Sequence, residues 1–283
     1  MQAGTKRELL GSRSSLQASF WRFFPWHSVP DKFRIIADCS YLNFDVKTEG
    51  PNRVFSLKGD GVMQKTNPNI LVFASGTRTG GGSGFETMVR ASRTRPPTLD
   101  AWICAVITNH FAGGVWHKAR ALGVHAECWT GPFQAQGYQN LVKYFKADYV
   151  MLSGWLKRVT GLDPARTINI HPGPLPCFGG PKLYGHHVHK AVMAAYHRGE
   201  ITHSAVTMHF VDEIYDHGPI IFALPIPIEP DDTPETLAAK VNHAEHEWQP
   251  RVLNYVVQGQ VRLVGKKVVY ETEELKRLLM PEV

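Results

Sequence analysis

Long apolar runs and closely spaced cysteines are both missing from this sequence, and each absence excludes a class of protein. No apolar run approaches the roughly 18 residues of a membrane-spanning helix, so we expect neither an integral membrane protein nor a membrane partner. The four cysteines are too far apart for a CxxC zinc or redox motif and too few for a disulfide scaffold. They are Cys39, Cys104, Cys128 and Cys177. We therefore expect a reducing compartment, with the cytoplasm as the first candidate.

The sequence also lacks a large excess of charge of either sign. Its 283 residues include 31 Lys+Arg and 25 Asp+Glu, which leaves a net charge of +6 with histidine neutral. So small an excess fits a mildly basic surface or attraction to an anionic small molecule, and we expect no nucleic-acid partner. The hydrophobic share of 43% is ordinary for a folded protein and argues against wholesale disorder.

Residues 1–62 differ from the rest of the chain. Residues 1–30 are basic and contain several serines, loosely like an organelle transit peptide, but no cleavage signal is legible. We interpret residues 1–62 as an extension of unknown role: a targeting segment, a spurious upstream start or an accessory element. The folded domain is expected over residues 63–283. If residues 1–62 are a transit peptide, an organelle replaces the cytoplasm as the expected compartment.

From residue 68 onward, short apolar runs alternate with segments of helical spacing. Strands are expected at residues 70–74, 102–107, 124–129, 149–153 and 167–170. This βαβ order predicts an α/β fold with a doubly wound, mostly parallel Rossmann-like sheet. After a helix at residues 185–198, strands at residues 204–211 and 219–228 predict an antiparallel pair toward the C-terminal part. A long helix from residue 232 toward residue 257 and a hairpin at residues 261–271 complete the expected elements.

Glycines dominate residues 75–84, between the first expected strand and the helix after it. Glycine lets the backbone approach a ligand closely, and the amides at a helix N-terminus favour an anion. The loop has neither a GxGxxG with a following acid nor the Gly-Lys-Ser/Thr of a P-loop, so a dinucleotide site fits poorly. Placement between a strand and a helix favours phosphate binding over the alternative, a flexible surface loop.

Asn169 and His171 lie at the carboxyl end of an expected strand, where open α/β sheets bind their ligands. The two residues are two apart, so both side chains leave the same face of an extended strand. An amide and an imidazole that converge on one point suit a carbonyl oxygen that becomes an oxyanion. The alternative is a structural histidine that caps a turn.

Asp216 lies in an acidic segment between the two antiparallel strands, just before Gly218-Pro219. A constrained loop of this kind can hold a carboxylate against a histidine. A solvated turn is the alternative interpretation of the same residues.

In the order in which they occur, these segments resemble the folate-dependent formyltransferases. The resemblance is carried by the glycine-rich loop, by Asn169-x-His171-Pro172-x-x-Leu175-Pro176, by Tyr184-Gly185-x-His187-x-His189 and by the segment from His209 to Ile221. It covers residues 68–260 and implies the formyltransferase fold, small-molecule substrates, no nucleic-acid partner and a monomer or homodimer. The motifs are most similar to those of members that transfer a formyl group from 10-formyltetrahydrofolate to the glycine amine of 5-phosphoribosylglycinamide in purine (IMP) biosynthesis.

The resemblance also implies roles for individual residues. The implied catalytic residues are Asn169, His171 and Asp216. Phosphoribosylglycinamide would be bound by Gly82, Ser83, Gly84 and Glu245, and the folate by Lys157, Arg158, Val159 and Asn169. In the implied mechanism Asn169 and a protonated His171 stabilise the oxyanion, while Asp216 raises the pKa of His171 and orders a water. No metal is implied, because the histidines at positions 186, 187 and 189 lack a carboxylate at ligand spacing.

The sequence departs from the family pattern at a few positions. The phosphate loop is longer than usual and ends in Gly84 where asparagine is typical, and Gly173-Pro174 replaces the common turn after the catalytic histidine. An arginine that many members place near residues 134–138 is missing. Three other functions stay open: a formyltetrahydrofolate deformylase, a sugar N-formyltransferase and, outside enzymes, an inactive folate-binding module. An inactive module would be expected to lose one of the three catalytic residues.

Overall fold

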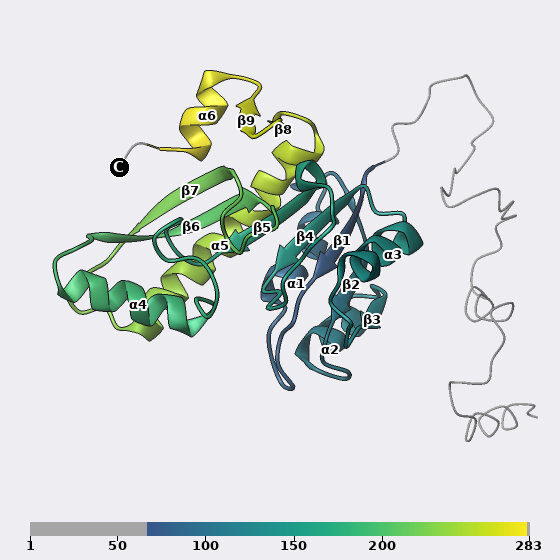
Figure 1. Cartoon of the computed structure of the whole chain (residues 1–283), viewed down its shortest axis with the longest axis horizontal. Helices are drawn as coiled ribbons and strands as arrows, with labels where there is room; N and C mark the ends of the chain where they lie inside the picture. The colour runs from purple at the N-terminus through teal and green to yellow at the C-terminus, as the bar shows by residue number, and fades with distance from the viewer. Residues whose placement is uncertain (1–66, 282–283) are drawn as a thin grey trace, which may run out of the picture. The chain divides into compact units, whose positions relative to one another are not determined.

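A central β-sheet organises residues 67–281, which are the residues that this computed structural model describes (Figure 1). The extension expected over residues 1–62 lies outside the described residues. Within residues 67–281, seven strands form the sheet in the order β3-β2-β1-β4-β5-β6-β7. The strands are β1 (Asn69–Phe73), β2 (Trp102–Thr108), β3 (Ala126–Cys128), β4 (Tyr149–Ser153), β5 (Thr167–His171), β6 (His203–Phe210) and β7 (Ile220–Pro227).

The strand directions confirm the doubly wound, mostly parallel arrangement predicted from the sequence. β1 pairs in parallel with both β2 and β4, β2 with β3, and β4 with β5. β6 then runs antiparallel to β5, and β7 antiparallel to β6. The chain adds β2 and then β3 on one side of β1, and then adds β4 and the later strands on the other side. The carboxyl ends of β1 and β4 therefore flank the point at which such sheets bind ligands.

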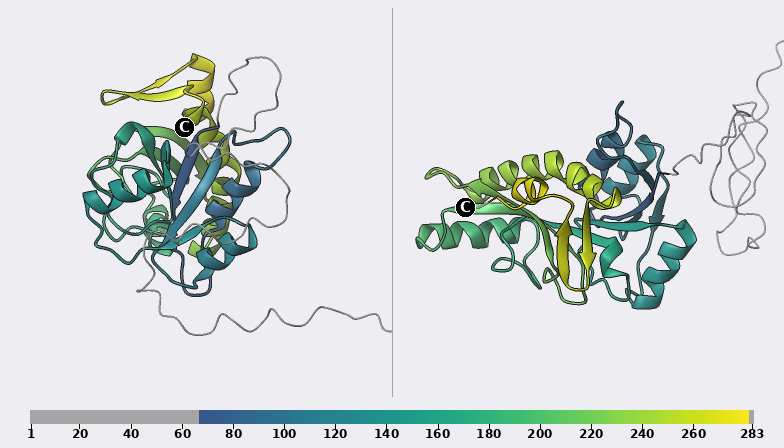
Figure 2. Two further views of the ribbon diagram at one scale, coloured as in Figure 1. Left: turned by 90° about the vertical axis from the view of Figure 1, so that its right-hand side faces the viewer. Right: turned by 90° about the horizontal axis from the view of Figure 1, so that it is seen from above.

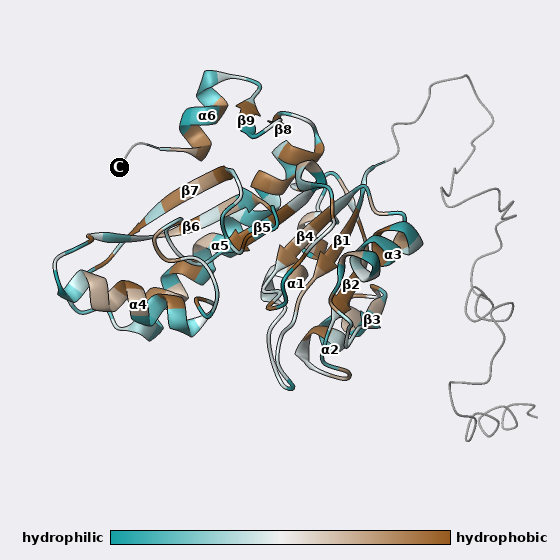
Figure 3. Ribbon diagram, viewed as in Figure 1, coloured by the Kyte–Doolittle hydropathy of each residue, from teal (hydrophilic) through white to brown (hydrophobic). Residues whose placement is uncertain are grey.

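The apolar runs of the central strands are covered on both faces of the sheet, as parallel strands require. Along β1, Ile70 and Val72 pack into one buried cluster, while Leu71 and Phe73 pack into another on the opposite face. Figure 3 shows the resulting brown colour of β1, β2 and β4. Because side chains alternate along a strand, each residue contacts the helices on one face of the sheet or those on the other.

Helices cover both faces of the sheet. Side chains of α1 (Ser83–Ala91), α2 (Gly114–Ala121), α4 (His186–His197) and α5 (Pro234–Val257) pack into the first cluster, and side chains of α3 (Ala135–Phe145) pack into the second. A short 3₁₀ helix, Pro164–Arg166, leads into β5. No helix within residues 67–281 has the length and apolar composition needed to cross a bilayer.

The long helix α5 begins at a well-defined cap and continues through Pro250. The side chain of Thr233 accepts a hydrogen bond from the backbone N–H of Thr236, and the side chain of Thr236 accepts one from the backbone N–H of Thr233. This reciprocal pair satisfies two of the donors that a helix start leaves free. The cap fixes the start of the helix that forms one wall of the site described below.

The C-terminal segment confirms the predicted hairpin and adds a helix. β8 (Val261–Val264) and β9 (Lys267–Tyr270) pair with each other, and α6 (Glu273–Leu279) follows. The hydroxyl of Tyr270 donates a hydrogen bond of 2.8 Å to the carbonyl oxygen of Ile221 and ties the hairpin to β7. Figure 2 shows this segment, in yellow, grouped at one side of the sheet.

Candidate active site

A cavity of about 630 Å³ opens at the carboxyl ends of β1, β4 and β5. Gly76 follows β1, Gly154 follows β4 and Pro172 follows β5, and all three line it. The start of α1 and one side of α5 form its other walls. The residues expected from the sequence to be catalytic or to hold the acceptor all line this cavity: Asn169, His171, Asp216, Gly82, Ser83, Gly84 and Glu245.

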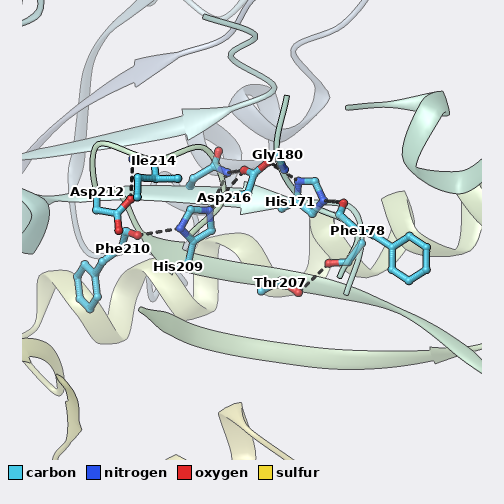
Figure 4. Close-up of polar contacts among 11 residues, drawn as sticks. His171, Phe178, Gly180, Thr207, His209, Phe210, Asp212, Ile214 and Asp216 are labelled. Carbon is cyan, nitrogen blue, oxygen red and sulfur yellow. Dashed lines mark hydrogen bonds and ion pairs between the residues drawn. The ribbon is translucent and has the colours of Figure 1, made fainter. Parts of the chain in front are cut away.

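Asn169 and His171 project from β5 on the same face of the strand, as their spacing predicted. Asn169 pairs in register with His209 of β6, and His171 pairs with Thr207. The side chain of His171 is buried and donates a hydrogen bond of 2.8 Å from Nε2 to the carbonyl oxygen of Phe178 (Figure 4). That bond leaves Nδ1 as the ring nitrogen that faces Asp216.

Asp216 comes from the loop between β6 and β7 and has a left-handed backbone, with φ of 53°. Its Oδ2 accepts a hydrogen bond of 3.0 Å from the backbone N–H of Gly180 and lies 3.6 Å from Nδ1 of His171. Its Oδ1 accepts a hydrogen bond of 3.2 Å from Nδ2 of Asn169. The structure thus brings Asp216 next to His171 and to Asn169, which lies 47 positions earlier in the sequence.

Burial sets the protonation state of His171, and this corrects the expectation of a charged ring. Burial lowers the pKa of His171 below its ordinary value, although the charge of Asp216 and the carbonyl of Phe178 act in the opposite direction. His171 is therefore neutral at neutral pH. It carries its proton on Nε2 and its lone pair on Nδ1, on the side of Asp216.

Asp216 stays ionised beside this ring. Burial opposes its ionisation, but the proximity of the His209 and His171 rings and the N–H of Gly180 together hold the pKa of Asp216 below its usual value. A carboxylate next to a neutral imidazole favours any step in which the imidazole takes up a proton.

His209 belongs to this cluster, although sequence reasoning gave it no role. It is buried, and its Nδ1 donates a hydrogen bond of 2.7 Å to the carbonyl oxygen of Phe210. A protonated Nδ1 makes Nε2 the acceptor for the Nδ2 group of Asn169, at 3.0 Å. His209 and Asp216 together fix the orientation of the Asn169 amide. This contact follows from the register in which β5 and β6 pair, which a local sequence pattern does not give.

The glycine-rich loop reaches the cavity as the predicted lead into a helix. Gly82 is the N-cap of α1, with φ of 75°, and a Cβ there would lie 2.9 Å from Cγ2 of Val115. Only glycine fits both the left-handed backbone and this close approach. The next residues, Ser83 and Gly84, begin the helix, so its first amides and its positive dipole end face the cavity.

One side of α5 presents a stripe of polar residues to the cavity. Asn242, Glu245, His246 and Gln249 all line it, at the spacing of one helix face. Nδ2 of Asn242 donates a hydrogen bond of 3.4 Å to Glu245, and burial raises the pKa of Glu245 to about 7. The sequence singled out Glu245 alone. The signal for the others is helical spacing: Asn242 and Gln249 lie three and four residues from Glu245, and His246 lies four residues after Asn242.

The residues expected to bind the folate lie beside a second, smaller hollow. Lys157, Arg158 and Val159 line it, and Asn169 borders both this hollow and the larger cavity. The ammonium group of Lys157 lies over the ring of Phe133, and Arg158 donates a hydrogen bond of 2.9 Å to the carbonyl oxygen of Glu213. Val159 packs into the core. The two cations border the hollow, whereas the valine mainly supports the turn.

The histidines after Gly185 lie near the cavity without forming a metal centre. His186 and His189 line the cavity, and burial lowers the pKa of His189 to about 4. Among residues 67–281, no group of three or more His, Cys, Asp and Glu side chains is placed to hold a metal ion.

A family model and several known proteins match this chain. A family model described as Formyl transferase matches residues 68–253. The chain is 37% identical over 204 residues to "Phosphoribosylglycinamide formyltransferase, chloroplastic" of Arabidopsis thaliana, a match over 68% of this chain and 66% of that protein. The chain thus spans just under two-thirds of the length of that plant relative.

Two bacterial proteins are matched over nearly their whole length. The phosphoribosylglycinamide formyltransferase of Bacillus subtilis is 28% identical over 202 residues, which cover 66% of this chain and 94% of that protein. The crystal structure of phosphoribosylglycinamide formyltransferase from Brucella melitensis is 29% identical, with a TM-score of 0.57, over 71% of this chain and all of that one.

Proposed function

The chain belongs to the formyl transferase family, and from this premise we propose that it transfers a formyl group from 10-formyltetrahydrofolate to the glycine amine of 5-phosphoribosylglycinamide in purine biosynthesis. One observation carries the proposal. A single cavity joins the Asn169–His171–Asp216 cluster to a helix N-terminus suited to a phosphate. The same cavity therefore suits both the phosphate and the amine of a phosphorylated amine. The names of the curated relatives and solved structures point to the same acceptor.

The acceptor would lie along the cavity between the helix N-terminus and the cluster. Its phosphate would accept hydrogen bonds from the amides around Ser83 at the start of α1, where the helix dipole is positive. Glu245, whose pKa burial raises to about 7, also lines the cavity and would bind a ribose hydroxyl. The glycine amine would then reach the reacting cluster.

The chemistry begins when the neutral amine attacks the formyl carbon and the carbonyl oxygen becomes an oxyanion. The Nδ2 group of Asn169 has two N–H donors, so one of them would turn from Asp216 to this oxygen and stabilise it while His209 keeps the other. The neutral Nδ1 of His171 would accept a proton from the attacking nitrogen, and Asp216, 3.6 Å away, would stabilise the imidazolium. The same proton would then pass to the folate nitrogen as the carbon–nitrogen bond breaks.

The smaller hollow has a volume of only about 40 Å³, so the formyl-bearing part of the folate would lie in the large cavity beside it. Asn169 borders both spaces, so a formyl group placed at this junction would reach the cluster. Lys157 and Arg158 border the hollow and suit an anionic part of the folate. No step of this transfer calls for a metal ion.

An assay with three acceptors tests the proposed function. Purified protein is given 10-formyltetrahydrofolate with 5-phosphoribosylglycinamide, with an amino-sugar nucleotide or with water alone, and release of tetrahydrofolate is followed. We expect release that depends on phosphoribosylglycinamide. Equal release in water would indicate a deformylase, and dependence on the amino sugar would indicate a sugar N-formyltransferase. Folate binding without release in any arm would indicate an inactive binding module.

The partners and the compartment belong to the same proposal. We expect small-molecule substrates only and a monomer or homodimer, which light scattering distinguishes. The cytoplasm is the proposed compartment unless residues 1–62 act as a transit peptide, and the plant relative is named as chloroplastic. Fluorescent fusions of the full chain and of residues 63–283, imaged in the same cells, separate the two outcomes.

A further inference from the structure

Gln249 is a buried polar side chain that the mechanism above does not use. It lies on α5, one turn beyond Glu245, lines the cavity and is only 1% exposed. Its Nε2 has no hydrogen-bond partner among residues 67–281. Because burying an amide N–H without an acceptor is costly, such a group in a cavity wall points to a ligand that supplies the acceptor.

The amide of Gln249 lies against the start of α1, at Gly84. A Cβ on Gly84 would lie 2.5 Å from Oε1 of Gln249 and would also collide with Oγ of Ser153. Position 84 is therefore closed to any side chain while Gln249 keeps its place. This is the position at which the family pattern has asparagine. A half-turn of the terminal amide exchanges Nε2 and Oε1, so Nε2 can face a ligand oxygen seated over Gly84.

Few cations line the cavity, so a neutral hydrogen-bond donor at the N-terminus of α1 would stabilise a phosphate bound there. Among the described residues that line the cavity, Lys182 is the sole lysine or arginine, and it comes from the loop between β5 and α4. Besides the backbone amides and the helix dipole, the start of α1 offers an anion the hydroxyls of Thr77 and Ser83, but no lysine or arginine. A buried side-chain amide adds a donor there without the desolvation cost of a charged group.

We propose that Gln249 is a phosphate-binding residue: its Nε2 donates a hydrogen bond to the acceptor phosphate held at the N-terminus of α1. In this chain the side-chain amide at the phosphate site comes from Gln249 on α5, in place of an asparagine at position 84. Gly84 and Gln249 are in this sense linked, since the Gln249 amide, together with Oγ of Ser153, fills the space that a side chain at position 84 would enter. The inference rests on the proposed function for the identity of the acceptor, but not for the presence of a phosphate site.

The first test removes the amide and keeps the shape. In Gln249→Met, the KM for 5-phosphoribosylglycinamide should rise about 10-fold or more, since a hydrogen bond to a charged group is lost. Both kcat and the Kd of a folate analogue should change less than about twofold. Gln136→Met, an exposed change on α3 away from the cavity, is the matched control and should leave all three constants unchanged. A KM within twofold of the wild type, or equal weakening of both ligands, would overturn the inference.

The second test exchanges the two positions. Gly84→Asn alone should weaken acceptor binding because the new side chain meets the Gln249 amide. Because the new side chain also meets Oγ of Ser153, the rescue is tested in a Ser153→Ala background: there, Gly84→Asn combined with Gln249→Ala should recover part of that loss and have a KM below that of either change made alone. Simple additivity of the two losses would show that the residues do not share one site.

A third measurement separates this inference from the proposed function. Inorganic phosphate is titrated into the full chain and into Gln249→Met, and binding is followed by the shift of the melting temperature. Phosphate should stabilise the wild type and stabilise the variant distinctly less, whichever acceptor the enzyme uses. If the wild type responds but does not formylate phosphoribosylglycinamide, the proposed acceptor is wrong and Gln249 keeps its role. If the wild type formylates that acceptor while both proteins respond equally to phosphate, the role of Gln249 is wrong.

Discussion

Nδ1 of His171 lies 3.6 Å from Oδ2 of Asp216, while Nε2 of the same ring is held at 2.8 Å by the carbonyl oxygen of Phe178. The carbonyl can only accept, so the proton of the neutral ring is on Nε2. Nδ1 is then the nitrogen that takes up a proton, and it does so beside a carboxylate. The pair is arranged to stabilise an imidazolium formed during the reaction rather than one present from the start.

The first prediction concerns Asp216→Asn, which removes the charge and keeps the shape. Turnover should fall by roughly 10²-fold or more, in the range of general acid–base groups, because the imidazolium loses its counter-ion. Binding of a folate analogue should change by less than about 1 kcal/mol, the net value of a neutral hydrogen bond. Steady-state kinetics and a binding titration measure the two effects. Loss of binding and turnover in equal proportion would assign Asp216 to structure.

The pH profile of Asp216→Asn gives an independent check with a defined sign. Asp216 raises the pKa of His171 against the larger lowering by burial, so its removal should lower that pKa further. The proton-accepting form of His171 then persists to lower pH. The acid limb of kcat should therefore move toward lower pH in the variant. An unmoved limb would show that another group controls it.

The second prediction concerns the phosphate end. Ser83→Asp places a negative charge at the start of α1, where the acceptor phosphate is expected. Its KM for phosphoribosylglycinamide should rise by at least about 10-fold, as expected for a lost or repelled charged contact, with the Kd of a folate analogue unchanged. Ser83→Ala keeps the backbone amides and should stay within about twofold. Equal damage to both ligands in the aspartate variant would move the phosphate elsewhere.

The third prediction is that residues 1–62 do not contribute to catalysis. In the part of the chain that the structure describes, the lining residues of the cavity run from Gly76 to Gln249 and include every residue with a proposed role in catalysis. A chain that starts at Met63 should therefore match the full chain in kcat and in both KM values. Soluble protein with reduced kcat would show that the extension reaches the site, and insoluble protein would show that it completes the core.

The fold and the paired residues of β5 could be predicted because they depend on local pattern. Ile70 and Val72 face one layer of helices and Leu71 the other, so a continuous apolar run predicted a strand covered on both faces. Asn169 and His171 share a face because side chains alternate along any strand.

Other features depend on tertiary contacts that no local pattern contains. His209 joins the site through the β5–β6 register, and a shift of one residue would turn it away. Gln249 is buried because α5 packs against α1. The charge of His171 was predicted incorrectly because burial outweighs the neighbouring carboxylate, and the depth of burial is a property of the assembled cavity.

Burial of His189 makes the stability of the fold depend on pH. Its side chain is 5% exposed, and burial lowers its pKa to about 4 from an ordinary value of 6.5. Between these two values the unfolded chain holds a proton at His189 and the folded chain does not. Unfolding therefore takes up a proton, and acid favours the unfolded state in this window.

The fourth prediction follows from that sign. The free energy of unfolding of the wild type should fall as the pH is lowered from 7 to 5, with at most about 1.4 kcal/mol per pH unit from this one group. His189→Gln removes the titrating ring, so its unfolding free energy should fall less steeply over the same interval. His197→Gln, at an exposed position on the same helix, should keep the wild-type slope. Urea unfolding at several pH values measures the three slopes. Identical slopes for the wild type and His189→Gln would mean that His189 takes up its proton over the same pH range in the folded and unfolded states, so that burial does not exclude its charge.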